Sequence, residues 1–308
     1  MRLFDLHCDT LYRAFTEQST LFNDEFHISF NKSSGISPYI QCLAIWIPDE
    51  YRGKDAVALF DGCVAKLKEQ LEASSIVWCR SADDIEFVSK NHRQGIILTV
   101  ESGAALAGDL HRITELYDIG VRMMTLTWNG SNELGDGIGI TENGGLSEFG
   151  RMAVHEMEKT GIIVDISHAG EKLFWDVESI AEKPFVASHS NARSITPHRR
   201  NLMDEQITAL VQHKGLIGLN YCVDFLNKDK TKAKMCDIID HAGYFIEYGA
   251  GSALAMGADF DGADIPSDMR GIESVEELYR LFVKRFGENI TNDIFFGNAF
   301  RFFTENLK

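Results

Sequence analysis

The sequence predicts an α/β fold in which eight parallel strands close into a (β/α)8 barrel. Eight short apolar runs, each typical of a buried strand, alternate along the 308 residues with segments whose apolar side chains recur at helical spacing. Helices between successive strands indicate a parallel sheet that is covered by those helices. Because the strand count is eight, a closed barrel is favoured over an open sheet.

The predicted elements follow one another in regular order. The strands occupy residues 3–10, 40–47, 95–101, 121–127, 162–168, 184–189, 216–220 and 253–259. The helices occupy residues 55–73, 106–117, 147–160, 171–181, 204–212, 234–248, 275–286 and 292–306. Residues 128–145 are rich in Gly and Asn and are predicted to form a loop. No linker-like or low-complexity run interrupts the sequence, so we expect one domain over residues 1–308.

The composition argues against several kinds of partner. Apolar residues make up 44% of the chain, which is enough for a large core. The formal net charge of -16 argues against binding to nucleic acid, which requires a basic surface. No apolar stretch approaches the roughly 18 residues of a membrane span, and the first predicted strand is not preceded by a secretory signal. Together with six cysteines that form no Cys-x-x-Cys pair, these features predict a soluble cytoplasmic protein that does not bind membranes.

The first predicted strand carries a histidine and a carboxylate two residues apart, His7 and Asp9. Because side chains alternate along a strand, both would point to one side and Cys8 to the other. An imidazole nitrogen and a carboxylate oxygen held side by side can bind one divalent metal ion. Taken alone the triplet indicates little, because such residues at a strand end are often hydrogen-bonded structural residues.

Residues of metal-ligand type also end later strands: Glu101, His168, His189 and Asp259. In (β/α)8 enzymes the chemistry collects at the carboxyl ends of the strands, so we expect these side chains to meet. We assign His7 and Asp9 to one metal ion and the two later histidines to a second, with Glu101 bridging both ions. Two divalent cations would stabilise a bridging hydroxide near neutral pH, and this hydroxide is the expected nucleophile.

Two choices stay open on the residues alone. Asp259 ends the last predicted strand and Asp261 follows it, and either carboxylate could take the proton of a metal-activated water and return it to a leaving amine. The alternative for this motif is a turn in which both Asp side chains bond backbone N–H groups. Arg199 and Arg200 follow the sixth strand, where a guanidinium could pair with a substrate carboxylate or could belong to a solvated basic loop.

Six motifs carry a family resemblance. They are His-x-Asp at 7–9, Val-Glu-Ser-Gly at 100–103, Asp-Ile-Ser-His at 165–168, Ser-His-Ser-Asn-Ala at 188–192, Arg-Arg-Asn-Leu at 199–202 and Gly-Ala-Asp-Phe-Asp-Gly at 257–262. In order and spacing the chain resembles the membrane (renal) dipeptidases, zinc-dependent barrel enzymes of the wider amidohydrolase group. The resemblance implies two Zn²⁺ ions, or other divalent metals, with Glu101 between them. It also implies Asp259 as the acid/base residue and Arg200 as the residue that holds the C-terminal carboxylate of the substrate.

One position departs from the family pattern. After the fourth strand the mammalian enzymes carry a histidine that helps to bind the scissile carbonyl, and here Trp128 takes its place. The indole N–H can donate a hydrogen bond but the ring cannot be protonated or accept one. We assign Trp128 to substrate binding and expect substrate preference or rate to differ from the mammalian enzymes. The secretory signal and lipid-anchor tail of those enzymes are also missing, which is typical of a soluble microbial member.

The resemblance therefore implies a zinc-dependent dipeptidase that forms a homodimer and hydrolyses the peptide bond of dipeptides. It allows a small leaving amino acid, including one of D configuration. One alternative is another hydrolase of the same metal-barrel group, acting on an N-acyl amino acid, a cyclic amide or a lactone. A second alternative is a barrel that kept its metals as a binding protein but lost turnover.

Overall fold

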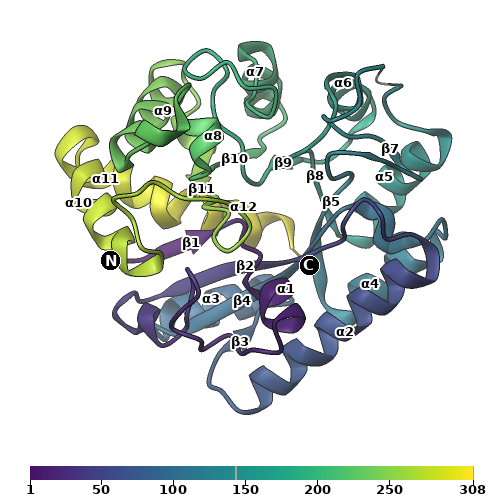
Figure 1. Cartoon of the computed structure of the whole chain (residues 1–308), viewed down its shortest axis with the longest axis horizontal. Coiled ribbons are helices and arrows are strands. Elements are labelled where there is room, and N and C mark those ends of the chain that lie inside the picture. Colours follow the sequence, from purple (N-terminus) through teal and green to yellow (C-terminus); the bar gives the residue numbers. More distant parts are fainter. Residues whose placement is uncertain (143, 308) are drawn as a thin grey trace.

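The computed structural model of the chain describes residues 1–142 and 144–307, and it contains the predicted closed barrel of eight parallel strands (Figure 1). Neighbouring strands pair in the order β2, β1, β11, β10, β9, β8, β5, β4, and β4 pairs back onto β2, which closes the barrel. The barrel strands are β1 (Leu3–Asp5), β2 (Tyr39–Trp46), β4 (Gln94–Glu101), β5 (Val121–Thr125), β8 (Ile163–Asp165), β9 (Val186–Ala187), β10 (Leu216–Leu219) and β11 (Leu254–Met256).

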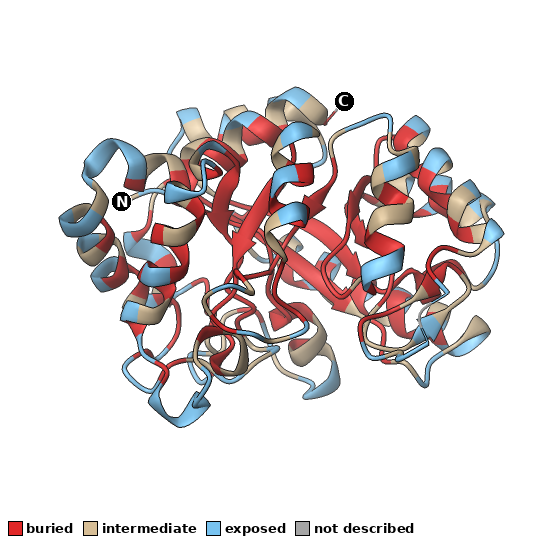
Figure 2. Cartoon of the chain, turned by 90° about the horizontal axis from the view of Figure 1, so that it is seen from above, coloured by how far each residue is buried: buried red, intermediate tan, exposed pale blue. Residues whose placement is uncertain are grey.

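Helices surround the barrel, and buried residues concentrate on the strands while exposed residues lie on the outer helices (Figure 2). The α-helices are α1 (Thr10–Thr16), α2 (Gly53–Glu72), α3 (Ala82–Lys90), α4 (His111–Ile119), α5 (Glu148–Thr160), α6 (Glu171–Ile180), α7 (Asp204–Gln212), α8 (Val223–Leu226), α9 (Met235–Glu247), α10 (Val275–Phe286), α11 (Glu288–Asn292) and α12 (Asn298–Asn306). Strands covered by such a helical layer can be apolar on both faces, which explains why the barrel strands read as continuous apolar runs. Among the described residues, no helix has the length and apolar character that a bilayer crossing requires.

The end of the chain packs against its beginning. The ring of Phe4 in β1 lies 6.2 Å from the ring of Phe296 and 5.0 Å from that of Phe303 in α12. Phe296 lies in a π-helical turn (Asp293–Gly297) that contacts both β1 and β11. These apolar contacts support β1 where it is inserted between β2 and β11.

Several predicted boundaries were wrong. The strand predicted for residues 3–10 ends at Asp5, because the chain then bonds only irregularly to the residues after β11 and turns into α1 at Thr10. The helix predicted for 106–117 starts only at His111, since a 3-10 turn (Gly103–Leu106) ends in Ala107 with a left-handed φ of 52°. The helix predicted for 292–306 is divided by the π-helical turn. The remaining 3-10 turns are Lys32–Gly35, Lys230–Lys232, Gly251–Ala253 and Ile272–Ser274.

Some short elements were not predicted. They are α1, α3, α8, α11, the outer strand β3 (Val77–Trp78) and a two-stranded hairpin, β6 (Ser131–Asn132) and β7 (Gly135–Asp136). The hairpin lies within the Gly-rich loop predicted for residues 128–145. Apart from the nine-residue α3, these segments contain too few turns or alternations for a periodic pattern to stand out.

Candidate active site

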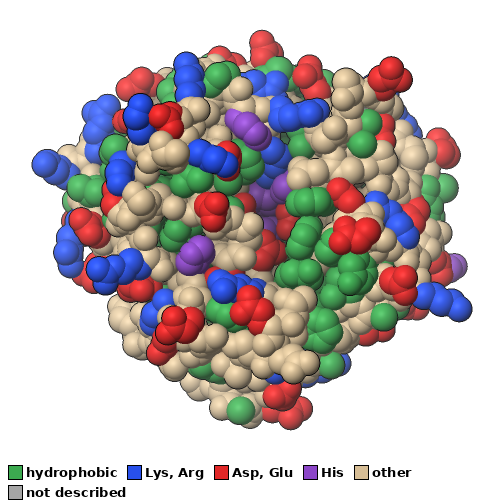
Figure 3. Space-filling model, in the orientation of Figure 1, with side chains coloured by type: hydrophobic (Ala, Val, Ile, Leu, Met, Phe, Trp, Pro, Cys, Tyr) green, Lys and Arg blue, Asp and Glu red, His purple; other side chains and the backbone are tan. Residues whose placement is uncertain are grey.

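The predicted ligand residues lie together in a hollow at the carboxyl ends of the strands, where histidine and acidic side chains gather (Figure 3). The His7 Nε2 atom lies 3.6 Å from Asp9 Oδ2, 3.6 Å from Glu101 Oε2 and 3.8 Å from Asp259 Oδ1. These side chains are almost fully buried. The short β1 strand does not itself hold His7 and Asp9, but the irregular pairing beyond it still directs both side chains into the site.

Glu101, the last residue of β4, faces two groups of ligands at once. Its Oε1 atom lies 2.9 Å from His168 Nε2 and 3.5 Å from His189 Nε2, while Oε2 is turned toward His7. The two histidine Nε2 atoms are 2.9 Å apart. This is the arrangement expected of a carboxylate that can bridge two metal ions.

Asp259 is placed as a possible ligand as well as an acid/base residue. Its carboxylate forms a compact group of ligand-type atoms with His7 and Asp9, and His7 forms a second such group with Glu101 and His189. In each group the atoms lie within 4.8 Å of one another. A carboxylate that exchanges a proton with metal-activated water lies in the same place as one that binds the metal. The position of Asp259 is therefore compatible with both roles.

The donor atoms fit divalent cations. His7 Nε2 and Asp9 Oδ1 are buried and have no hydrogen-bond partner among the described residues. Burial, together with the negative charge of Asp9, raises the pKa of Glu101 and raises that of Asp259 to about 6. Burial alone would lower the pKa of His7, but the charges of Glu101 and Asp9 raise it to about 10. Bound cations would stabilise these buried carboxylates by neutralising their negative charge. Imidazole and carboxylate together are a donor set suited to zinc and similar metals.

The two later histidines are held by hydrogen bonds on their outer nitrogens. His168 Nδ1 lies 2.9 Å from Asn129 Oδ1, an acceptor that requires the proton to sit on Nδ1. His189 Nδ1 lies 2.7 Å from Ser188 Oγ, and that hydroxyl donates to Asp165 Oδ2 at 2.6 Å. Burial lowers the pKa of both histidines, so each is neutral with its Nε2 lone pair turned toward Glu101.

These supporting residues were missed by the sequence analysis. Asp165 and Ser188 belong to two of the six family motifs, and Asn129 directly follows Trp128. All three residues therefore stand next to predicted site residues in the sequence. Nothing in their spacing indicated which histidine each would contact, because the contacts join different strand ends. Asp165 also accepts hydrogen bonds from Thr125 and from the backbone N–H of Ser167 and Ser188, which ties three strands together beneath the site.

The turn that carries Asp259 is held in an uncommon conformation. Asp259 and Asp261 have positive φ angles of 61° and 66°, which cost free energy for residues other than Gly. A Cβ atom on Gly262 would lie 1.9 Å from Asp9 Oδ2 and 2.6 Å from Asp259 Oδ1. Only Gly at this position lets the two carboxylates approach each other. Asn220 Nδ2 donates to Asp259 Oδ2 at 3.1 Å and orients the other oxygen toward His7.

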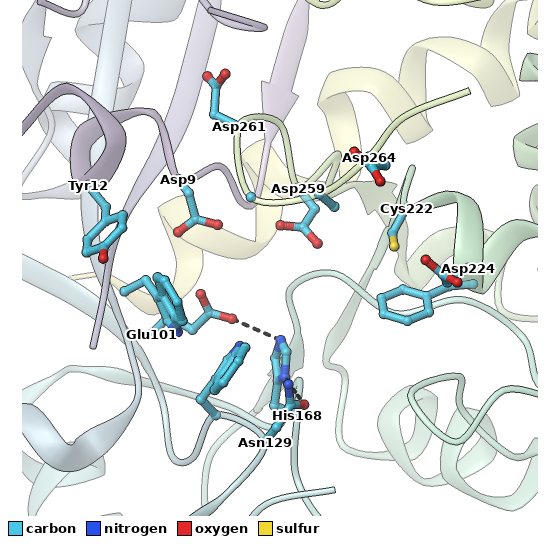
Figure 4. Close-up of a pocket in the computed structure, with 15 residues that line it drawn as sticks. Asp9, Tyr12, Glu101, Asn129, His168, Cys222, Asp224, Asp259, Asp261 and Asp264 are labelled. Carbon is cyan, nitrogen blue, oxygen red and sulfur yellow. Dashed lines mark hydrogen bonds and ion pairs between the residues drawn. The ribbon is translucent and has the colours of Figure 1, made fainter. Parts of the chain in front are cut away.

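Asp261 has a different environment from Asp259. Its carboxylate points away from those of Asp9 and Asp259 and is fully buried (Figure 4). It accepts hydrogen bonds from the Thr10 hydroxyl at 2.6 Å, the Arg13 guanidinium at 3.1 Å and the backbone N–H groups of His27 and Ile28. With its lone pairs engaged in this way, Asp261 anchors the turn, and the geometry favours Asp259 for proton transfer.

Replacing Asp261 by Asn is expected to lower the free energy of unfolding by about 2 kcal/mol, because an amide cannot accept all four hydrogen bonds or pair with Arg13. Urea denaturation of the metal-loaded protein would measure the change. Asp264→Asn is the matched control, since Asp264 is an exposed carboxylate of the same loop. Equal stability of both variants would show that Asp261 does not anchor the turn.

Arg199 and Arg200 also differ in their burial. Arg199 is exposed, whereas Arg200 is 7% exposed and its guanidinium lies over the ring of Phe225 at 5.3 Å. Arg200 Nη2 donates to the backbone carbonyl of His189 at 3.3 Å, and Arg200 Nε is buried with no hydrogen-bond partner among the described residues. Of the two arginines, only Arg200 therefore has a buried guanidinium with a donor unpaired among the described residues, next to the backbone of His189.

A cavity of about 360 Å³ opens above the cluster. Its lining comprises Asp9, Tyr12, Trp46, Glu101, Trp128, Asn129, His168, Cys222, Asp224, Phe225, Asp259, Asp261, Gly262, Ala263 and Asp264. Trp128, which we predicted to contact substrate, thus borders the cavity, with its ring 6.0 Å from that of His168. The volume is suited to a small organic molecule.

Comparison with known proteins places the chain in a family. The family model described as membrane dipeptidase (peptidase family M19) matches residues 1–307. An uncharacterised protein from the pqqA 5′ region of Klebsiella pneumoniae is 30% identical over 65% of this chain and 77% of its own length. An uncharacterised dipeptidase of Schizosaccharomyces pombe is 29% identical over 70% of this chain, and a dipeptidase of Claviceps purpurea is 30% identical over 68%. These matches cover 55% and 49% of the two fungal proteins, so the chain spans about half of their length.

Solved structures show the same fold. A metallopeptidase of Rhodobacter sphaeroides, bound to a phosphinate mimic of the dipeptide L-Ala-D-Ala, superposes with a TM-score of 0.92 at 24% identity. The match covers 100% of this chain and 99% of that one. The metallopeptidase dipeptidase AC superposes with a TM-score of 0.93 at 24% identity over 100% and 98% of the two chains. With the family model matched over nearly the whole sequence, the chain belongs to the membrane dipeptidase family, peptidase family M19.

Proposed function

We propose that this protein is a metal-dependent dipeptidase in which Arg200 recognises the C-terminal carboxylate of the substrate. The observation that carries the proposal is the buried guanidinium of Arg200, with Nε unpartnered among the described residues, beside a cluster that fits two metal ions. A buried cation with a free N–H donor is well suited to bind a carboxylate. The structural relative from Rhodobacter sphaeroides, which binds a mimic of a dipeptide, supports the same substrate class.

His7 and Asp9 would hold one metal ion, His168 and His189 the other, and Glu101 both. When bound, the two ions would polarise the scissile carbonyl and lower the pKa of water. The residues of the chain supply positioning and proton transfer. Asp259, oriented by Asn220, would accept a proton from the attacking water and return it to the leaving amine.

Trp128 borders the cavity where the mammalian enzymes place a histidine, so an indole N–H would be the donor available to the substrate there. We further propose zinc as the bound metal, a homodimer as the assembly and the cytoplasm as the location. Elemental analysis, analytical ultracentrifugation and cell fractionation test these three points separately.

Replacing Arg200 by Ala is expected to raise KM for a dipeptide about 10- to 100-fold, because a charge-assisted hydrogen bond to the carboxylate is lost. The same variant should change KM little for a dipeptide amide, which has no carboxylate. Steady-state kinetics with both substrates measure the difference.

Arg199→Ala is the control, because it removes an exposed charge from the neighbouring position. An equal rise in KM for the dipeptide and its amide would exclude carboxylate recognition by Arg200. Hydrolysis of N-acyl amino acids, cyclic amides or lactones in preference to dipeptides would favour the related hydrolases instead.

A further inference from the structure

We propose that the rings of Tyr12, Trp46 and Trp128 form a subsite for a bulky apolar side chain on the first residue of the dipeptide. The proposed subsite rests on the proposed dipeptidase function and predicts which dipeptides the site would prefer. The three rings line the same cavity as Asp9, Glu101 and Asp259, so a group bound against them would lie next to the reacting peptide bond.

The three rings are in contact through Trp46, which packs against the other two. The ring of Trp46 lies 5.0 Å from that of Tyr12 and 5.0 Å from that of Trp128, with interplanar angles of 71° and 61°. Such edge-to-face contacts are favourable arrangements for aromatic pairs. The rings come from α1, from the end of β2 and from the loop after β5, and each is only partly buried. The wall is therefore formed before a ligand binds, which lowers the entropy cost of binding.

The topology of the barrel places Trp46, the central ring of this wall, opposite Arg200. Arg200 follows β9, and in the closed strand order three strands separate β9 from β2 in either direction. Trp46, at the end of β2, and Arg200 thus lie on opposite sides of the barrel mouth, with the ligand cluster between them. A dipeptide whose carboxylate contacts Arg200 and whose peptide carbonyl lies at the cluster would extend its first residue toward Trp46.

The chemistry of the cavity differs between its two sides. Tyr12 lies on one side, while Cys222, Asp224 and Asp264 lie on the other (Figure 4). An apolar side chain against the rings would lose contact with water and gain contact area, whereas a charged one would give up most of its hydration against the aromatic faces. A difference of one or a few methylene groups in an apolar pocket typically changes kcat/KM by about 10- to 200-fold.

A series of dipeptides with Gly as the second residue tests the subsite, because neither the size nor the configuration of the second residue then varies. We expect kcat/KM for Phe-Gly and Leu-Gly to exceed that for Ala-Gly about tenfold or more. Trp46→Leu and Tyr12→Leu should each reduce this ratio severalfold.

Trp175→Leu is the matched control, because Trp175 is a partly buried indole of α6 that packs on Phe174 and is absent from the cavity lining. This variant should keep the ratio of the unmodified protein. Equal kcat/KM for Phe-Gly and Ala-Gly in the unmodified protein would overturn the subsite while leaving the dipeptidase function intact. A ratio that Trp46→Leu and Trp175→Leu change equally would also overturn it. If no dipeptide is hydrolysed by the metal-loaded protein, the proposed function falls together with the subsite.

Discussion

Replacing Asp259 by Asn is expected to lower kcat about 10²- to 10⁴-fold while the protein keeps both metal ions. The amide has the size of the carboxylate but cannot accept and return a proton. The asparagine side chain should occupy the same place as the aspartate. Asn220 bonds Oδ2 at this position, and Gly262 leaves room for the second terminal atom beside Asp9. Burial raises the pKa of Asp259 to about 6, which suits a group that exchanges protons with water and a leaving amine.

Metal content distinguishes the two roles that the geometry allows for Asp259. Elemental analysis alongside kcat should show an unchanged metal ratio if Asp259 serves proton transfer alone. Loss of metal in the variant would identify Asp259 as a ligand, because it belongs to a ligand-type group with His7 and Asp9. A kcat close to that of the unmodified protein would exclude both roles.

Replacing His7 by Ala is expected to remove the ion shared with Asp9 and to abolish dipeptide hydrolysis. His7 Nε2 lies within 3.8 Å of three carboxylates and is buried with no hydrogen-bond partner among the described residues. Loss of the imidazole leaves these carboxylates crowded together with one ligand fewer, so affinity for the first ion should fall most. The metal-to-protein ratio after dialysis, measured by elemental analysis, reports this loss independently of activity.

His155→Ala provides the control, because His155 is an exposed histidine of α5 that belongs to neither group of ligand-type atoms. This variant should keep the full metal ratio and activity. A His7→Ala protein that also kept both would show that the cluster is not the metal site.

The fold was predicted more completely than its details. All eight barrel strands were identified in order, because a strand buried by surrounding helices is apolar along its length. The ends of the strands were predicted less accurately, as β1 shows: Leu6 and Cys8 continue the apolar alternation after regular pairing has stopped. The single-domain organisation stays a prediction from the absence of a linker.

The sequence by itself determined which residues were candidates for the site. Their residue types and their positions at the ends of apolar runs predicted that they meet at one end of the barrel, because the carboxyl ends of parallel barrel strands lie on one face. Only the tertiary structure decided how they meet. The 2.9 Å approach of His168 to Glu101, the outward direction of Asp261 and the burial of Arg200 but not Arg199 depend on contacts between strands distant in sequence. Such contacts leave no periodic signal, because each is set by the closure of the barrel and not by neighbouring residues.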